Sequence, residues 1–594
     1  MYRLRSLPYF EKWIILGFII GVGIGIFAIL FTFIYEVFKS LFLTYILHIS
    51  LPQPFNPEFS YTYNLFIPLV VGLGGLIAGI IVYTLAPEAA GGGIDYAVYA
   101  YHNIGKIRKR VSIIDLISST IILGSGGSAG DLGPMGLIGA SVASFLTEIL
   151  HLSPEDIRKA IAIGIGSGVA AIFKAPIGGA LLSAEILYRR DFEPEVILPS
   201  IIASAIAYSI YGFYAGFEPF LGVYTYTFSP LQLPFYALFG IVIGILSIVF
   251  VKIYSSITTL FKKTKLPNFV KPAIGGLLAG IPMIILPEII GTGYGWDYIL
   301  YKGNFSVINT FGIPLILFLF LLAIVKMISS SLTIGSGGSG GIEAPAFEIG
   351  ALIGASYGEI FHILFPAIIP TVAPFVIIGL LTMFGAPAKT PVSVIIIVTE
   401  MTASLQLLPG EMIAVVIAYV ITGRYSLYPS QYPTRKDSPA DKVEYEVPIM
   451  EKLKVKDCKI DNIKIFINNT LEEAIKLMSE NNLASLPVID SNNSFIGILY
   501  LRDIENKKRS DKISKYVTLG SPYVSYSSSL EHALEVLGRN KSRWIPVVEN
   551  NKLQGILTID SIFEAYERET GRIKEREKHR RTRRNRRKQI KHIK

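Results

Sequence analysis

Two glycine-rich segments of this chain have the residue types and spacing that bind anions. They are GSGGSAGDLGP at 124–134 and GSGGSGGIEAP at 335–345, at an offset of 211 residues. A helix that begins after such glycines presents unpaired backbone N–H groups and the positive end of its dipole, which attract negative charge without a buried cation. Runs of small residues also allow close helix packing, but a matched pair indicates two helix starts that could converge on one anion.

A second match shows that the surrounding region is duplicated. The segment KAP at 174–176 with Glu185 matches KTP at 389–391 with Glu400, at an offset of 215 residues. Two ordered matches at nearly one offset are hard to obtain from glycine-rich composition alone. Broken helices paired in two halves predict a transporter or channel site.

The elements that must position these residues are membrane helices. Mean hydropathy is +0.50 and 17% of the 594 residues are charged, which is too apolar for a soluble protein of this size. Stretches at 13–34, 65–84, 235–254 and 314–330 approach the ~20 residues of one crossing. The first lacks a cleavage site and is predicted to be a retained helix. Other stretches are short and broken, which a membrane tolerates where the backbone is buried in protein or lines a cavity.

Basic residues are unevenly distributed. Neither 40–105 nor 191–251 contains Lys or Arg, so the loops at 52–64 and 212–233 are predicted to be extracellular. The basic clusters near residues 3–5, 106–110, 189–190 and 262–265 are predicted to be cytoplasmic. The tail at 572–594 has 13 Lys and Arg against two Glu, which accounts for the net charge of +10. This tail is either a solvated charge run or a contact with anionic lipid; nothing else in the chain predicts nucleic-acid binding.

Glu343 is a candidate gate. It and Leu132 occupy equivalent positions, two residues after a glycine and two before a proline. An ionisable group at membrane depth costs at least ~2.5 kcal/mol on insertion scales and is usually functional. At a helix start it would compete with an anion when ionised and release the path when neutral, so flux would rise as pH falls. The alternative is that Glu343 points away and pairs elsewhere or reaches water.

After residue 432 the chain becomes polar and contains another repeat. TLEEA, LPVID and GIL within 470–499 recur as SLEHA, IPVVE and GIL within 529–557. Each copy predicts helix, strand, turn, strand and helix, a small soluble α/β unit. Cys458, the single cysteine, lies in this part, excludes an internal disulfide and is predicted to be a buried, inert thiol.

From residue 13 to residue 439 the sequence resembles the CLC family of anion channels and transporters. The segments that carry the resemblance are AGGGI at 90–94 (GSGIP in the family), GDLGP at 130–134 (GREGP or GKEGP), GIEAP at 341–345 (GxFxP), SLY at 426–428 with the pore tyrosine, and FKAPIGG at 173–179, which resembles the dimer-side helix. The resemblance implies an all-α polytopic membrane fold, an inverted-repeat bundle of short tilted helices, and a homodimer with one pore per subunit. It also implies chloride or a similar small anion as bound substrate, near Gly92, Leu132, Ile342, Glu343 and Tyr428.

Four departures from the family bear on mechanism. The family's pore serine aligns with Gly92, its gating glutamate with Leu132, and its inner proton glutamate with Ile186. The pore phenylalanine of its GxFxP segment aligns with Glu343. Leucine and isoleucine cannot carry a proton, so passive movement through a channel or uniporter is predicted. A proton-coupled chloride antiporter that uses Glu343 is the alternative. Without a hydroxyl at Gly92, poor discrimination between chloride and nitrate is expected.

The soluble repeat resembles a tandem CBS pair, a module that often binds adenine nucleotides through the pattern Gly-Ile-x-Thr/Ser-x-x-Asp. The first copy keeps Asp503 but has Tyr500 at the hydroxyl position, and the second keeps Thr558 but has Ser561 in place of Asp. Asp503 and Thr558 are therefore the nucleotide-binding candidates. A purely structural dimerisation module is the alternative.

Two other classes of protein fit the sequence less well. A zinc protease needs two histidines four apart on a helix with a glutamate, and none of the seven histidines form such a pair. No catalytic or metal-binding residue is therefore predicted. A CBS-regulated cation transporter would need clustered carboxylates, whereas those of the membrane part, Glu185, Glu343, Glu348 and Glu400, are scattered along the sequence.

The predicted organisation has four parts. They are a transmembrane domain at 1–434 (repeats at roughly 1–215 and 230–434), a linker at 435–450, a CBS pair at 451–567 and a basic tail at 568–594. We expect a multi-pass protein of the cell membrane with the CBS pair and C-terminus in the cytoplasm. No resident cofactor is predicted, apart from an adenine nucleotide if the CBS pair is a sensor.

Overall fold

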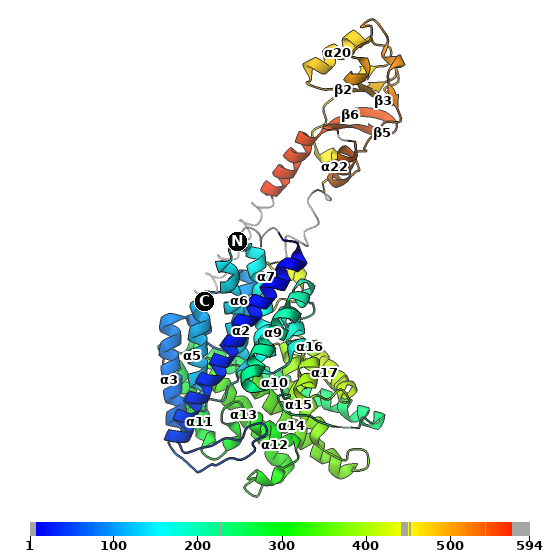
Figure 1. The fold of residues 1–594 in the computed structure, drawn as a ribbon. Helices are drawn as coiled ribbons and strands as arrows, with labels where there is room; N and C mark the ends of the chain where they lie inside the picture. The colour runs from blue at the N-terminus through cyan, green and yellow to red at the C-terminus, as the bar shows by residue number, and fades with distance from the viewer. Residues whose placement is uncertain (1–6, 226, 441–449, 451–452, 541, 573–594) are drawn as a thin grey trace. The chain divides into compact units, whose positions relative to one another are not determined.

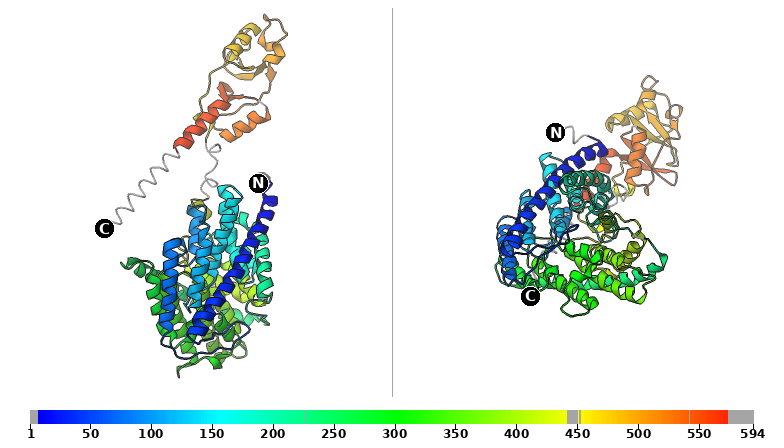
Figure 2. Two further views of the ribbon diagram at one scale, coloured as in Figure 1. Left: turned by 60° about the vertical axis from the view of Figure 1, so that its left-hand side comes forward. Right: turned by 60° about the horizontal axis from the view of Figure 1, so that its bottom comes forward.

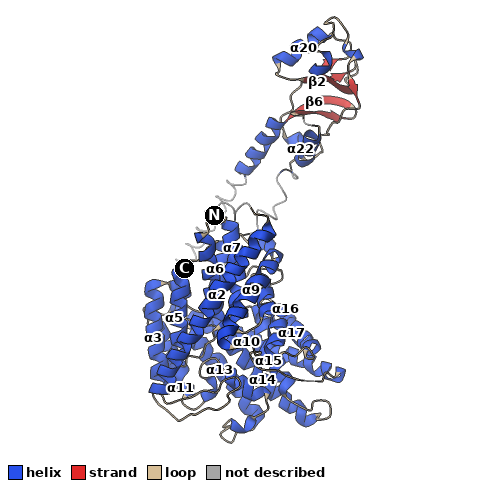
Figure 3. Ribbon diagram, in the orientation of Figure 1, coloured by secondary structure: helices blue, strands red, loops and turns tan. Residues whose placement is uncertain are grey.

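A computed structural model describes residues 7–225, 227–440, 450, 453–540 and 542–572. The chain forms two compact units, Met1–Asp441 and Lys442–Lys594, shown in Figure 1. Strands named in the structure all belong to the second unit, and the first is built of helices (Figure 3). Of the basic tail predicted at 568–594, residues 568–572 end a helix and the rest lies outside the described residues.

The described part of the first unit contains two successive sets of eight α-helices. The first set is α2 (Tyr9–Lys39), α3 (Ile67–Leu85), α4 (Ile94–Asn103), α5 (Arg110–Gly124), α6 (Leu132–Ile149), α7 (Pro154–Ile172), α8 (Pro176–Glu185) and α9 (Ile197–Ala215). The second set is α10 (Leu233–Lys263), α11 (Lys271–Met283), α12 (Tyr294–Tyr301), α13 (Leu315–Gly335), α14 (Glu343–Leu364), α15 (Ala373–Ala388), α16 (Pro391–Thr402) and α17 (Leu408–Thr422). The two shortest helices stand in corresponding places in both sets, α4 and α8 in the first and α12 and α16 in the second, as the duplication predicts.

Equivalent turns adopt the same unusual backbone conformation. Lys174 and Lys389 both lie in the left-handed region, with φ of 53° and 65°. Each residue stands two positions before a proline that opens a short helix, α8 or α16. The fixed φ of proline suits the first turn of a helix, so these two sharp turns begin the short helices in both halves.

Each short helix caps the other. Glu185 at the end of α8 accepts hydrogen bonds from the N–H groups of Val392 and Ser393, at 3.1 and 2.7 Å. Glu400 of α16 accepts them from Ile177 and Gly178, at 3.1 and 2.8 Å. Both carboxylates therefore satisfy unpaired donors at a helix start, and these two glutamates have a structural role.

Six helical stretches of the described residues are long and apolar enough to cross a membrane. They are Tyr9–Ile46, Ile67–Leu85, Leu132–Ile149, Pro194–Ala215, Pro230–Lys263 and Leu315–Gly335. The four spans predicted from sequence overlap four of these. Figure 2 shows α2, in dark blue, running obliquely across the bundle.

Close packing of the helices depends on glycine. A Cβ on Gly139 would collide with the carbonyl of Gly164, and a Cβ on Gly164 would collide with the carbonyl of Gly139. Gly350 and Gly379, at the equivalent positions of the second half, make the same contact.

The second unit consists of two small α/β repeats. A four-stranded sheet has the order β1 (Ile465–Phe466), β2 (Ser485–Ile489), β3 (Phe495–Tyr500) and β4 (Thr518–Leu519), and β5 (Trp544–Glu549) pairs with β6 (Lys552–Thr558). The named helices are α20 (Leu471–Glu480), α21 (Leu501–Ile504) and α22 (Leu530–Arg539). Phe495 N–H donates to Asn551 O and Leu553 N–H to Asn493 O, both at 3.1 Å. These reciprocal bonds join equivalent residues of the two repeats.

Candidate functional site

The predicted anion-binding residues of the two halves meet where α6 and α14 begin. Gly130 and Gly341 occupy equivalent positions, and the N–H of each donates to the carbonyl of the other at 2.7 Å. Asp131 and Ile342 follow immediately, as the residues that precede the first turns of α6 and α14. Reciprocal antiparallel pairing of equivalent residues indicates a local two-fold axis, so the positive ends of both helix dipoles come together.

Glu343 places its carboxylate at this meeting point. The side chain is fully buried, and Oε1 accepts a hydrogen bond of 2.7 Å from the hydroxyl of Tyr428. Oε2 has no hydrogen-bond partner in the described part of the chain. It lies against Gly133 and Gly341, because a Cβ built on either glycine would touch it. A negative group thus stands between two helix starts and a donor hydroxyl, the surroundings expected for a small anion.

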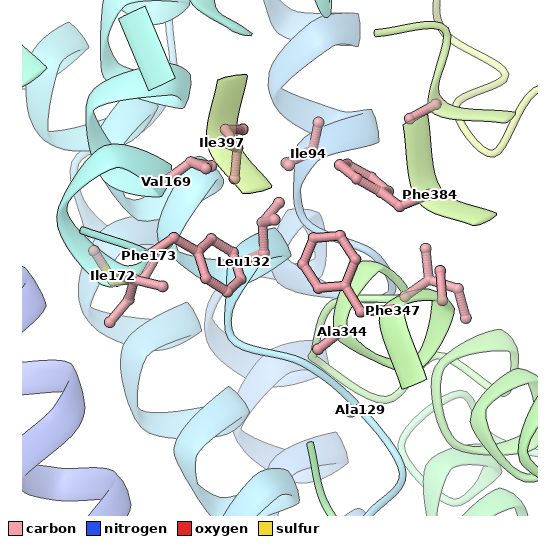
Figure 4. Close-up of a cluster of buried hydrophobic side chains, with 14 of the residues drawn as sticks. Ile94, Ala129, Leu132, Val169, Ile172, Phe173, Ala344, Phe347, Phe384 and Ile397 are labelled. Atoms are coloured by element: carbon pink, nitrogen blue, oxygen red, sulfur yellow. The ribbon is translucent and has the colours of Figure 1, made fainter. Parts of the chain in front are cut away.

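Leu132 lies in an apolar cluster beside this point. Figure 4 shows its side chain beside Phe173 and Phe347, whose rings are in edge-to-face contact with centroids 5.6 Å apart. Leu132 is fully buried, as is Ile186, whose backbone carbonyl accepts a hydrogen bond of 2.9 Å from Gln431 Nε2. Leu132 and Ile186 stand at the two positions expected to hold proton-carrying glutamates. Both side chains are enclosed, and neither has a group that can take up a proton.

A large cavity adjoins the site on the Gly92 side. Its volume is about 810 Å³, and its lining includes 90–93, Tyr254, Lys262, Lys271 and Ser426. Gly92 lies close to the helix crossing, since its carbonyl would be 3.3 Å from a Cβ on Gly133. The loop before α4 thus separates this cavity from the Glu343 carboxylate.

A smaller cavity lies on the other side of the same segment. Its volume is about 280 Å³, and Asp131, Tyr294, Lys174 and Glu36 are among its lining residues. Asp131 Oδ1 accepts a hydrogen bond of 2.6 Å from the Tyr294 hydroxyl. Asp131 lines the smaller cavity, and Gly133, two residues on, lies against the carbonyl of Gly92, which lines the larger cavity. Asp131 was not predicted as a site residue, although it is the charged residue of the first glycine-rich segment.

A buried ion pair supports the wall of the smaller cavity. Lys326 Nζ lies 2.5 Å from Glu348 Oε2, and both side chains are fully buried. Lys326 also donates to the carbonyls of Ile289 and Gly291, at 3.2 and 3.1 Å. These contacts fix the loop that leads to Thr292 and Tyr294 in the cavity lining. Glu348 therefore belongs to an internal ion pair.

The two nucleotide-binding candidates lie in different repeats. Asp503, in α21, is 41% exposed at its side chain and lies 3.6 Å from Arg502. The Thr558 hydroxyl, at the end of β6, accepts a hydrogen bond of 3.2 Å from Ser561 N–H and lies 2.9 Å from the Ser561 hydroxyl. Ser561 therefore occupies part of the hydrogen-bonding capacity of Thr558.

Burial raises the pKa of the Cys458 thiol to about 11, so this thiol is protonated at neutral pH.

The fold and the site together define a class of protein. Two sets of membrane helices bring two helix starts together between two cavities, and this arrangement is that of an anion transport protein with a path at its repeat interface. The sequence profile of the family described as voltage gated chloride channel matches residues 74–423, and the chain belongs to this family. The CBS domain profile matches 455–507 and 513–568. The family consists of anion channels and transporters, so the chain is not an enzyme.

The relatives include proteins named as proton–chloride exchangers and proteins named as chloride channels. The H(+)/Cl(-) exchange transporter ClcA of Vibrio parahaemolyticus is 29% identical over 369 residues, which cover 60% of this chain and 77% of that protein. The chloride channel protein CLC-f of Arabidopsis thaliana is 28% identical over 449 residues, 66% of this chain and 56% of the relative. A crystal structure of a eukaryotic CLC transporter covers 93% of this chain and 98% of its own, with a TM-score of 0.58 and 18% identity. This likeness supports the fold.

Proposed function

We propose that this protein moves chloride or similar small anions passively across the cell membrane, as a channel or uniporter gated by Glu343. The observation that carries the proposal is the position of the Glu343 carboxylate, hydrogen-bonded to Tyr428 at the crossing of α6 and α14. The anion would bind to backbone N–H groups near Leu132, Ile342 and Glu343 and to the Tyr428 hydroxyl. Gly92 borders the adjoining cavity.

Protonation gives this gate its physical basis. An ionised Glu343 carboxylate has the charge of the transported anion, accepts the Tyr428 hydroxyl and stands beside both helix starts, so it excludes the anion. A neutral carboxyl group holds the Tyr428 hydroxyl less strongly, because hydrogen bonds to charged groups are the stronger ones. Anion flux should therefore rise as pH falls.

Proton-coupled exchange through Glu343 is the second candidate. It is favoured by the same carboxylate, because a group that takes up a proton whenever an anion leaves could couple the two movements. Against it, Leu132 and Ile186 stand where the family has its two proton carriers, and both side chains are buried among apolar groups. A cation transporter has less support: Glu185 and Glu400 cap helices, and the described residues hold no cluster of three possible metal ligands.

Reconstitution in liposomes tests these alternatives. Wild-type protein, Glu343→Gln and the control Glu359→Gln, near the far end of the same helix α14, would be compared for chloride efflux and proton movement across a range of pH. We expect pH-dependent chloride efflux without uphill proton movement. Glu343→Gln should conduct at all pH values, roughly tenfold above wild type at neutral pH, equivalent to ~1.4 kcal/mol. An unchanged pH profile would rule out the gate, and stoichiometric uphill proton movement would establish exchange.

The remaining assignments are proposals at the level of the assembly. We infer a homodimer through the apolar surfaces of α8 and α16, where Ile177 and Val392 are 60% and 45% exposed.

We also infer a cytoplasmic CBS pair that binds ATP or AMP weakly or at one site only. Calorimetry on the full-length protein, with Asp503→Ala and Thr558→Ala, would test this. Two tight sites would contradict the inference, and absence of binding would favour the structural role.

A further inference from the structure

Gly92 has one polar neighbour in the space that a side chain would fill. A Cβ built there would meet only the Tyr254 hydroxyl, at 3.7 Å. The neighbouring Gly91 and Gly93 have φ of +86° and +53°, whereas Gly92 lies outside the left-handed region and can accept another residue. The position where the family carries a hydroxyl on the loop is therefore approached by a hydroxyl from a different element.

Tyr254 comes from α10, in the second half of the fold. Its side chain lines the 810 Å³ cavity together with 90–93, and Lys262, two turns further along α10, lines it too. Thr258, one turn away, is the side-chain hydrogen-bonding neighbour of the Tyr254 hydroxyl, although its Oγ1 has no partner of ordinary geometry among the described residues. No carbonyl or carboxylate in that part of the chain accepts a hydrogen bond from the Tyr254 hydroxyl. A phenol O–H in such surroundings normally has an acceptor.

Neighbouring groups place this hydroxyl on the path. Tyr254 Oη approaches Gly92, Gly92 O approaches Gly133, and Gly133 lies against Oε2 of Glu343. Tyr428 donates to the other oxygen of the same carboxylate. Two tyrosine hydroxyls thus stand on the two sides of the loop and helix start that separate the cavity from the gate.

We propose that Tyr254 is an anion-binding and specificity-determining residue, whose hydroxyl takes the role that a side chain at Gly92 cannot fill. The inference rests on the proposed function, because it concerns the anion that Glu343 controls. Its ligand is a small anion such as chloride, on its way between the cavity and the Tyr428 hydroxyl. One neutral donor binds an anion without the strong hold of a buried cation, which suits a site that must also release it.

A donor at Tyr254 changes the expected selectivity between chloride and nitrate. Chloride is more strongly hydrated than nitrate, so it loses more when a donor is removed from its path. With Tyr254 in place, the missing hydroxyl at Gly92 should matter little. Gly92→Ser should alter selectivity strongly only when the Tyr254 hydroxyl is absent.

The test measures chloride and nitrate flux through the reconstituted full-length protein. The variants are Tyr254→Phe, Gly92→Ser, the double variant, and the control Tyr99→Phe, which removes another hydroxyl from the lining of the same cavity. Tyr254→Phe should lower the chloride-to-nitrate flux ratio roughly fivefold, as expected for one hydrogen bond to a charged group. The double variant should recover most of the wild-type ratio, and Tyr99→Phe should retain it.

The outcomes distinguish the role of Tyr254 from the proposed function. A wild-type protein that moves no anion contradicts the proposed function, whereas a conducting Tyr254→Phe with the wild-type ratio overturns the role of Tyr254. Failure of the double variant to recover the ratio would show that the phenol acts through packing, which also overturns it. If Tyr254→Phe cannot be purified, Gly92→Ser alone decides: a change below about twofold supports the Tyr254 donor, and a change of roughly tenfold contradicts it.

Discussion

Charged residues at equivalent positions of the two halves have diverged. Leu132 of the first half corresponds to Glu343 of the second, and Asp115 of α5 corresponds to Lys326 of α13. Asp115 is buried and accepts a hydrogen bond of 2.6 Å from the Ser339 hydroxyl. Lys326 forms an internal ion pair in the other half. The duplicated scaffold has therefore kept its backbone geometry while its charges were redistributed.

Asp131 should control how readily anions reach the gate from the smaller cavity. Its carboxylate lines that cavity, and a negative charge at a narrow opening lowers the local anion concentration. Asp131→Asn should raise chloride flux a few-fold at low ionic strength, and an impermeant salt should reduce the difference because it screens the charge. Tyr294→Phe, which removes the hydroxyl partner and retains the charge, is the control. An equal gain at low and high salt would contradict this electrostatic effect.

At the scale of helices, much of the fold follows from the sequence. The glycine segments predict the starts of α6 and α14, and the matched KAP and KTP segments predict a duplicated region. The left-handed turns before α8 and α16 are seen only in the structure. The Glu343–Tyr428 contact depends on packing between residues 85 positions apart, which local pattern does not encode. Tyr254 was missed for the same reason, because nothing in α10 itself distinguishes this tyrosine from others on an apolar helix.

The reciprocal caps of α8 and α16 make a prediction about stability. Glu185 accepts three hydrogen bonds, from Val392 N–H and from the N–H and hydroxyl of Ser393, whereas Glu400 accepts two. Glu185→Ala should therefore destabilise the protein more than Glu400→Ala, with losses of about 1 to 3 kcal/mol because buried donors remain unpaired. Thermal unfolding of the two variants in detergent measures the difference. The reverse order would show that these contacts are not the main role of the carboxylates.

At the scale of the molecule, each unit is built by duplication around a reciprocal pairing of equivalent residues. In the first unit the pair is Gly130 and Gly341, and in the second unit Asn493 and Asn551 have that relation through their carbonyls. The first pairing brings two helix starts together at the anion site that we propose. The second joins two sheets and creates a shared surface, and half of the nucleotide pattern remains in each repeat.

The two cavities give the path electrically different ends. Two acidic and two basic side chains line each cavity: Glu36, Asp131, Lys39 and Lys174 in the smaller one, and Glu88, Asp95, Lys262 and Lys271 in the larger one. Their pairing differs, because Lys39 pairs with Glu36 within the smaller cavity. Glu88 pairs with Arg108, outside the lining of the larger cavity, so two lysines face one remaining carboxylate there. An anion waiting beside the lysines is concentrated there, whereas one on the far side must first pass a carboxylate. If the protein conducts passively, its current–voltage relation should rectify, with larger current when the voltage drives anions out of the lysine-lined cavity. Lys262→Gln should make the curve more symmetrical; a straight line in the wild-type protein, recorded in a bilayer with one orientation, would show that these charges do not reach the conducting path.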